Sequence, residues 1–193
     1  MTKFEVDHEK RLHLILVRRD GKNFQHVHPD MAQDGTWSIP TTLPEAGTYR
    51  VFADFTPENG KKTTLGADIH HPGDYRPQTY QDNRKFTVDD YEVTLKGDLT
   101  ANSASTVTAE ITRNGTPVTD LQDYLGAKGH LVALRTSDLA YLHVHPEAGD
   151  QVKFAVEVPT PGKYRLFLDF RHQDEVRTAE FTLTTHEEVG HGH

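Results

Sequence analysis

The feature that most constrains the fold is an internal repeat, because two copies of one pattern indicate two similar structural units. The segment His13–Pro29 aligns with His130–Pro146 without a gap and is identical at seven of seventeen positions. A second block, Pro44–Phe55, aligns with Pro159–Phe170 and is identical at seven of twelve positions. The repeat therefore predicts two tandem units of the same kind.

Both copies consist of short runs rich in β-branched and aromatic residues, separated by turn signals such as Asn59-Gly60 and Asn114-Gly115. No segment shows the 3.6-residue period of an amphipathic helix, so the sequence predicts an all-β chain of two immunoglobulin-like β-sandwich units. In the second unit we expect seven strands, at Tyr91–Lys96, Ser105–Thr112, Leu131–Arg135, Ala140–His145, Val152–Val158, Lys163–Arg171 and Val176–Thr184.

The expected organisation is a first unit at 1–69, a linker rich in proline and polar residues at 70–90, a second unit at 91–185 and a histidine-containing tail at 186–193. The second unit has about forty residues before His130, whereas only twelve residues precede His13. The first unit is therefore predicted to be short by about two strands. An open sheet edge invites pairing, so a homodimer or a strand-donating partner is expected there.

The motif His-Val-His-Pro occurs in both copies, and two histidines one residue apart on a strand point to the same face. A further histidine lies thirteen residues before the first motif histidine of each copy. In a tight hairpin the upstream strand lies beside the motif strand, which predicts one three-histidine metal site per unit. The candidate ligands are His13, His26 and His28 in the first unit and His130, His143 and His145 in the second.

Three further residues are candidates for these sites. Asp54 and Asp169 each interrupt an otherwise apolar strand end, and each could complete the ligand set or hold a histidine tautomer. His172 is a candidate extra ligand in the second copy alone. Neutral imidazole suits divalent transition metals, and the expected ion is Cu(II) or Zn(II).

Composition excludes several other kinds of site. The chain has no Cys and only two Met, which excludes thiolate centres and disfavours a thioether Cu(I) site. Its net charge of −8 argues against nucleic acid as a partner, and it has no apolar run long enough to span a membrane. The N-terminus lacks the apolar core of a signal peptide, so the sequence alone suggests either a cytoplasmic protein or one whose leader is absent.

Three functions are compatible with these residues. The first is a non-catalytic protein that binds copper or zinc for buffering or delivery. The second is a structural or protein-interaction module in which the histidines form a polar layer. The third is a metalloenzyme with an open three-histidine site. Since nucleophile and phosphate-binding motifs are absent from the sequence, enzymatic chemistry would have to depend on the metal.

The stretches His-Leu-Ile-Leu-Val-Arg, Phe-Gln-His-Val-His-Pro and Gly-Thr-Tyr-Arg-Val-Phe resemble a family of bacterial extracytoplasmic tandem β-sandwich proteins linked with metal handling. The second unit matches the same pattern. This resemblance implies a periplasmic or secreted location and histidine ligands at the six positions named above. A looser similarity to periplasmic copper-resistance sandwich proteins favours Cu(II).

Overall fold

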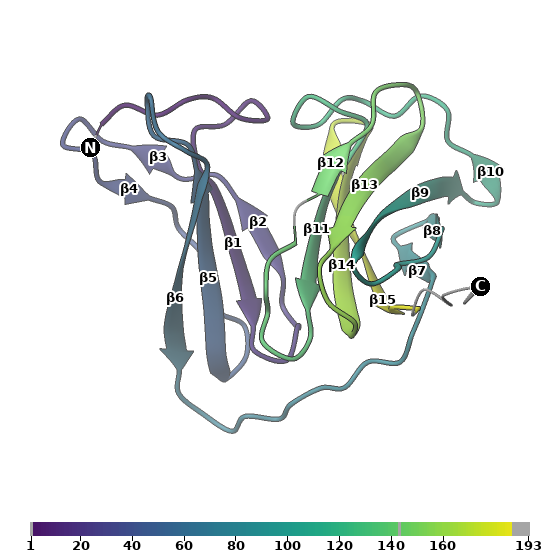
Figure 1. Ribbon diagram of the computed structural model, residues 1–193, viewed down its shortest axis with the longest axis horizontal. Coiled ribbons are helices and arrows are strands. Elements are labelled where there is room, and N and C mark those ends of the chain that lie inside the picture. Colours follow the sequence, from purple (N-terminus) through teal and green to yellow (C-terminus); the bar gives the residue numbers. More distant parts are fainter. Residues whose placement is uncertain (1, 143, 187–193) are drawn as a thin grey trace, which may run out of the picture. The chain divides into compact units, whose positions relative to one another are not determined.

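The computed structural model describes residues 2–142 and 144–186, and it confirms the all-β prediction (Figure 1). The described residues form strands and loops, and none of them lies in a helix that could cross a membrane. The chain divides into two compact units, Met1–Thr79 and Tyr80–His193. Each unit contains one copy of the sequence repeat, and each is described by itself below.

The first unit is built on a four-stranded antiparallel sheet with the strand order β2-β1-β5-β6. Two very short strands, β3 and β4, form a separate hairpin. The bounds of these strands are β1 His13–Arg18, β2 Gln25–Val27, β3 Asp30–Met31, β4 Trp37–Ser38, β5 Gly47–Phe55 and β6 Thr63–His71.

The second unit is a sandwich of two sheets. The larger follows the order β12-β13-β9-β8-β7, with β10 paired to β9, and the smaller follows β11-β14-β15. The bounds are β7 Lys85–Val88, β8 Tyr91–Lys96, β9 Ser103–Arg113, β10 Thr116–Pro117, β11 His130–Arg135, β12 Val144–Pro146, β13 Val152–Val158, β14 Lys163–His172 and β15 Glu175–Thr184.

The region expected to be a linker contributes strand residues at both ends. His70 and His71 are the last residues of β6, and Lys85–Val88 forms β7. The division between the two compact units falls between Thr79 and Tyr80. The irregular connection between β6 and β7 therefore covers only the middle of the expected linker.

The repeated sequence blocks form the same ladder in both units. His13 lies opposite Asp54 between β1 and β5, and His130 lies opposite Asp169 between β11 and β14. Because the register is the same at every paired position of these strands, β1, β5 and β6 of the first unit correspond to β11, β14 and β15 of the second.

A tyrosine near the start of β5 and β14 fixes the loop before each strand. The Tyr49 hydroxyl donates a hydrogen bond to the main-chain oxygen of Glu45 at 2.9 Å. In the second unit the Tyr164 hydroxyl donates to the main-chain oxygen of Thr160 at 2.7 Å. A buried tyrosine that bonds back to the backbone a few residues upstream is typical of immunoglobulin-like sandwiches.

Replacing Tyr164 with Phe is expected to lower the free energy of unfolding by about 1–3 kcal/mol, because the partly buried carbonyl of Thr160 would lose its donor. Urea unfolding followed by circular dichroism measures this loss. Tyr75→Phe is the matched control, since the Tyr75 side chain is 42% exposed and should change stability little. Equal effects of the two substitutions would contradict the role of the buried hydroxyl.

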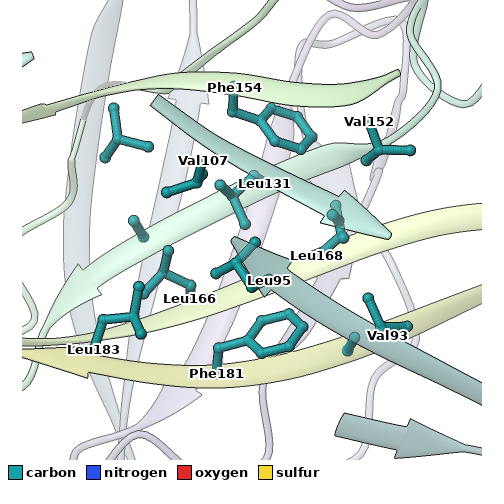
Figure 2. Packing of buried hydrophobic residues seen from close by; sticks show 14 of the residues in the cluster. Val93, Leu95, Val107, Leu131, Val152, Phe154, Leu166, Leu168, Phe181 and Leu183 are labelled. Carbon is teal, nitrogen blue, oxygen red and sulfur yellow. The ribbon is translucent and has the colours of Figure 1, made fainter. Parts of the chain in front are cut away.

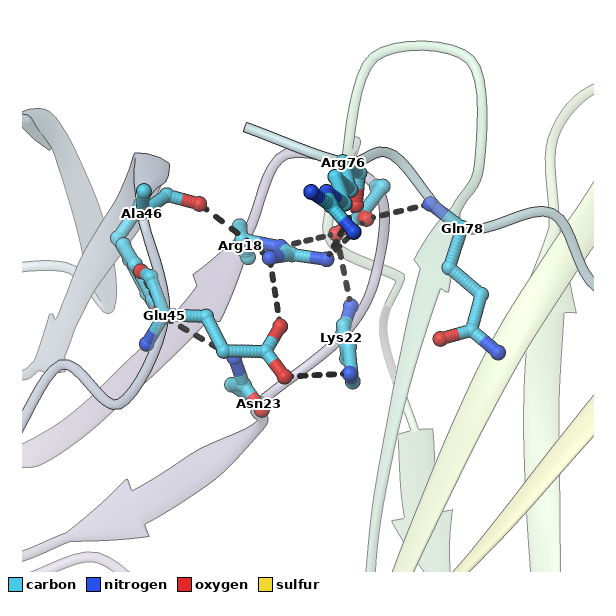
Figure 3. Close-up of polar contacts among 9 residues, drawn as sticks. Arg18, Lys22, Asn23, Glu45, Ala46, Arg76 and Gln78 are labelled. Atoms are coloured by element: carbon cyan, nitrogen blue, oxygen red, sulfur yellow. Dashed lines mark hydrogen bonds and ion pairs between the residues drawn. The ribbon is translucent and has the colours of Figure 1, made fainter. Parts of the chain in front are cut away.

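A buried arginine closes the end of the first unit where β1 turns into β2 (Figure 3). The Arg18 guanidinium binds both carboxylate oxygens of Asp20, at 2.9 and 2.6 Å, and reaches Glu45 at 2.6 Å. It also donates to the main-chain oxygen of Arg76 at 3.2 Å, while the main-chain N–H of Gln78 donates to the Asp20 carboxylate at 2.8 Å. These contacts attach the chain that follows β6 to the first unit.

The hydrophobic core of the second unit lies between its two sheets (Figure 2). Side chains from the smaller sheet, such as Leu166 and Phe181, meet side chains from β8, β9 and β13, such as Val107 and Phe154. All four are at most 1% exposed. This is the arrangement that alternating inward-facing residues of two packed sheets produce.

The first unit has a sheet that corresponds to the smaller sheet of the second unit. Among its described residues it has no counterpart of β8 and β9. Ile69 and Leu183 occupy equivalent positions, since each lies opposite the corner tyrosine of its unit. Ile69 is 44% exposed and Leu183 is 1% exposed. The expectation that the first unit is short of strands is thus confirmed.

Candidate metal centre

Three histidines converge on one face of the first sheet. Strands β1 and β2 are antiparallel, with Leu14 opposite Val27. This register places His13 beside His28, and the period-2 alternation of a strand puts His26 on the same face. The hairpin between the strands therefore brings the three imidazoles together, as their spacing predicted.

The ring nitrogens lie at distances that suit a single metal ion. His13 Nδ1 is 3.0 Å from His26 Nε2 and 3.2 Å from His28 Nε2. One ligand atom from each residue lies within 4.8 Å of the others. Two nitrogens bonded to one ion at about 2.0–2.1 Å, with an angle of roughly 90–110° between the bonds, are about 2.8–3.4 Å apart.

Within the described residues, this is the only group of three or more histidines, aspartates or glutamates that could hold a metal.

The tautomer of His13 is set by the backbone. His13 Nε2 is 3.0 Å from the main-chain oxygen of Asp7, which can only accept, so Nε2 carries the proton. The Nδ1 atom of the neutral ring is then a bare acceptor that faces the other two imidazoles. Its one lone pair cannot accept two good hydrogen bonds, whereas a cation would satisfy three converging lone pairs at once.

A lysine supports this arrangement from outside the histidine group. Lys62 Nζ contacts the Asp7 carboxylate at 2.7 Å and the Asp54 carboxylate at 3.5 Å. It thereby holds the residue whose carbonyl orients His13. Neither Asp7 nor Lys62 was a candidate at the sequence level, because a main-chain acceptor and a lysine partner leave no signal in the residue pattern.

The environment keeps the histidines neutral. Burial lowers the pKa of His13 to about 4; the contact with the Asp7 carbonyl opposes this shift, and the neighbouring His26 adds to it. Burial, followed by repulsion from His26 and His13, lowers the pKa of His28 to about 3. Both rings are therefore neutral near pH 7, the state in which imidazole binds metal ions.

These pKa values predict that the metal-free protein loses stability on acidification. The unfolded chain takes up protons at these two histidines near pH 6.5, but the folded chain does so only near pH 4 and below. Because the unfolded state binds more protons in that window, the free energy of unfolding should fall as the pH drops from about 6.5 to about 4.

Urea midpoints across this range, followed by Trp37 fluorescence, measure the slope. His28→Gln should make it shallower, and His70→Gln on the exposed strand β6 should not.

Asp54 and Asp169 occupy equivalent places, each directly opposite the first histidine of its unit on the neighbouring strand. The Asp54 carboxylate accepts a hydrogen bond from the Thr64 hydroxyl at 2.7 Å, and Asp169 accepts one from Thr178 at 2.6 Å. Asp54 is 5% exposed and lies outside the group of converging ligand atoms. Its contacts with Thr64 and Lys62 place it among the groups that surround the site.

The second unit arranges its histidine motif differently. His130 begins β11 in the smaller sheet, while His145 lies in β12, which pairs with β13 in the larger sheet. His143 lies outside the described residues. The segment before the motif pairs with β11 in the register of the first unit, since Leu134 lies opposite Tyr141 and the Leu142 amide donates to the main-chain oxygen of Ala133 at 2.9 Å. From Val144 onward the strand also pairs with β13, which has no counterpart among the described strands of the first unit.

His172 lies at the end of β14 and links a buried tyrosine to an exposed aspartate. Its Nδ1 is 2.7 Å from the Tyr91 hydroxyl, and its Nε2 is 3.1 Å from the Asp120 carboxylate. The imidazole is 5% exposed and its two nitrogens both contact these groups. This position explains why the first copy has no histidine there, since Tyr91 belongs to a strand without a counterpart in the first unit.

Comparison with known proteins gives a family and no named function. A search of curated proteins finds no match. A family model described as a domain of unknown function, DUF8832, matches residues 1–73 and 86–187, and so includes both copies of the repeat. The matched regions cover most of the chain, and the protein therefore belongs to the DUF8832 family.

Proposed function

We propose that the protein binds a divalent transition metal, copper or zinc, through His13, His26 and His28, and that it buffers or delivers this ion without catalysis. The observation that carries the proposal is the convergence of three imidazole nitrogens on one point, with the tautomer of His13 set by a backbone carbonyl. A polar layer alone would not require three ring nitrogens to meet at these distances.

The donor set supports these two metals. Three nitrogen ligands without sulfur suit Zn(II) and Cu(II), and the absence of Cys removes the thiolate ligands that select Cu(I). The looser similarity to copper-resistance sandwiches favours Cu(II). We also propose that the protein works outside the cytoplasm, as the resemblance described above implies, and that the second histidine set contributes a further site.

The test is metal content by elemental analysis of protein made without an affinity tag. His191 and His193 are replaced with Ala in every sample, so that the tail cannot collect metal. We expect His26→Ala to lose one metal equivalent per chain relative to this background, and His70→Ala, which removes an exposed histidine of β6, to lose none. Unchanged metal content in His26→Ala would reject the first site. His143→Ala, measured in parallel, tests the second site independently.

A second candidate function is supported by strand β6. It lies at the edge of the four-stranded sheet, and seven of its nine residues are exposed. A long exposed edge strand is a ready template for pairing with another chain, and we propose a second copy of the protein as that chain. Sedimentation equilibrium should show a dimer that Ala67→Pro dissociates. A monomer at all concentrations would reject this candidate and leave the metal proposal untouched.

A further inference from the structure

The sheet that bears the histidines has a second, apolar face. Side chains alternate along each strand, so Leu14 and Leu16 of β1 point away from the histidines. Together with Val51 and Ala53 of β5 they line a cleft of about 720 Å³. The volume lies within the range of small-molecule sites, which is about 300–1,000 Å³.

The second unit shows how this layer is normally filled. By ladder register, Leu183 is the counterpart of Ile69, which lines the cleft, and the two side chains are 1% and 44% exposed, respectively. Leu183 belongs to the core that the larger sheet completes. In the first unit the short strands β3 and β4 replace that sheet, and two residues in each cannot fill the same space.

The cleft has a second wall, which makes it a groove. The ring centroids of Trp37 in β4 and of the N-terminal Phe4 are 5.2 Å apart. Phe4 also packs edge-to-face on Phe55, with 5.5 Å between the ring centroids. The three aromatic rings all line the cleft. A flat sheet face would favour another sheet as its cover, whereas a two-walled groove accepts a narrow body.

The lining excludes a charged occupant. None of the residues around the cleft is ionisable, and Ser38 and Thr41 supply its only side-chain hydroxyls. This composition is unusual in a chain of which 26% of residues are charged. The part of a ligand that enters this groove must therefore be uncharged and apolar.

A smaller polar cleft of about 310 Å³ adjoins the groove and shares Leu12, Pro29 and Trp37 with it. Its other lining residues are Met31, His28 and four charged residues. The charged residues are the acidic Glu9 and Asp30 and the basic Lys10 and Arg11. The apolar groove therefore ends beside a cleft that contains charged residues.

We propose that the first unit binds a single-chain amphiphile, with its acyl chain in the apolar groove and its polar head in the adjoining charged cleft. The apolar lining, the groove shape and the two kinds of neighbouring surface all match such a molecule. The groove itself lies on the face opposite the histidines, whereas the charged cleft is also lined by His28, so metal is withheld when binding is tested.

Trp37 provides a specific readout, since it lines the groove and is the only tryptophan in the chain. The wild-type protein, kept in a metal chelator, is titrated below micellar concentrations with three probes, which are dodecanoic acid, monolauroylglycerol and lysophosphatidylcholine. We expect a saturable blue shift of the Trp37 emission, and the ranking of the probes identifies whether the head is anionic, neutral or zwitterionic.

Ala53→Phe fills the groove from within and should weaken binding at least tenfold. Ala148→Phe adds the same ring at an exposed position of the second unit and should leave binding unchanged. The absence of a saturable shift with every probe would overturn the proposal, as would equal binding by the two variants. A dimer in sedimentation that Ala53→Phe dissociates would assign the groove to a second copy and would also overturn it.

Discussion

Leu183→Ala should lower the free energy of unfolding by about 2–5 kcal/mol, the range typical of a fully buried leucine, whereas Ile69→Ala should lower it by less than about 1 kcal/mol. The two positions are equivalent in the repeat, because Leu183 lies opposite Tyr164 and Ile69 lies opposite Tyr49. Their side chains differ in surroundings, with exposures of 1% and 44%. The comparison therefore measures what the second sheet contributes to the second unit.

Urea unfolding followed by circular dichroism gives both values, and the pair serves as its own control because each substitution removes a branched aliphatic side chain from the same place in the ladder. A cost for Ile69→Ala as large as that for Leu183→Ala would mean that the first unit buries this face in solution. That result would contradict the open groove and, with it, the site for an amphiphile.

The sequence was most informative where local alternation and turn chemistry decide the structure. A tight hairpin and the period of a strand were sufficient to predict that His13 lies beside the motif strand, and the ladder between β1 and β2 has this arrangement. The sandwich class, the tandem repeat and the short first unit followed in the same way. The hairpin and the strand pattern depend on residues that are close together in sequence, and the repeat follows from comparing two such segments.

The second histidine motif shows a limit of this reasoning. The sequence predicted a strand at Ala140–His145, and Tyr141 does lie opposite Leu134 in the register of the first unit. The strand Val144–Pro146 then also pairs with β13 of the larger sheet, which begins at Lys85. A motif read by itself contains no information on this second partner.

The surroundings of the first site were also beyond the sequence. His13 is oriented by the main-chain oxygen of Asp7, and every residue type offers such an oxygen. The link from Lys62 to Asp7 joins residues 55 positions apart in the chain, and Lys62 also contacts Asp54. Such contacts arise from the packing of the whole unit, whereas Asp54 could be named in advance because a polar residue interrupts an apolar strand.

Zinc should stabilise the first unit, and the increment should disappear when one imidazole is removed. A ligand that binds only the folded state at a hundredfold excess over its dissociation constant raises the free energy of unfolding by about 2.7 kcal/mol. Zn(II) is the suitable ion because it has no redox chemistry. Trp37 lies in the first unit, so urea unfolding followed by its fluorescence reports on the unit that contains the three histidines.

His13→Ala should abolish this increment, because the ion would keep only two of the three converging nitrogens. Losing a residue that merely supports a ligand costs up to about 100-fold in metal affinity, and losing a ligand should cost more. His70→Ala is the matched control and should retain the full increment, because His70 lies on β6 outside the convergent group. Circular dichroism of the metal-free variant establishes that it folds. If zinc stabilised His13→Ala as much as the wild type, the ion would be bound elsewhere. The three imidazoles would then form the hydrogen-bonded layer of a structural module, because their ring nitrogens would share protons with one another instead of binding a metal.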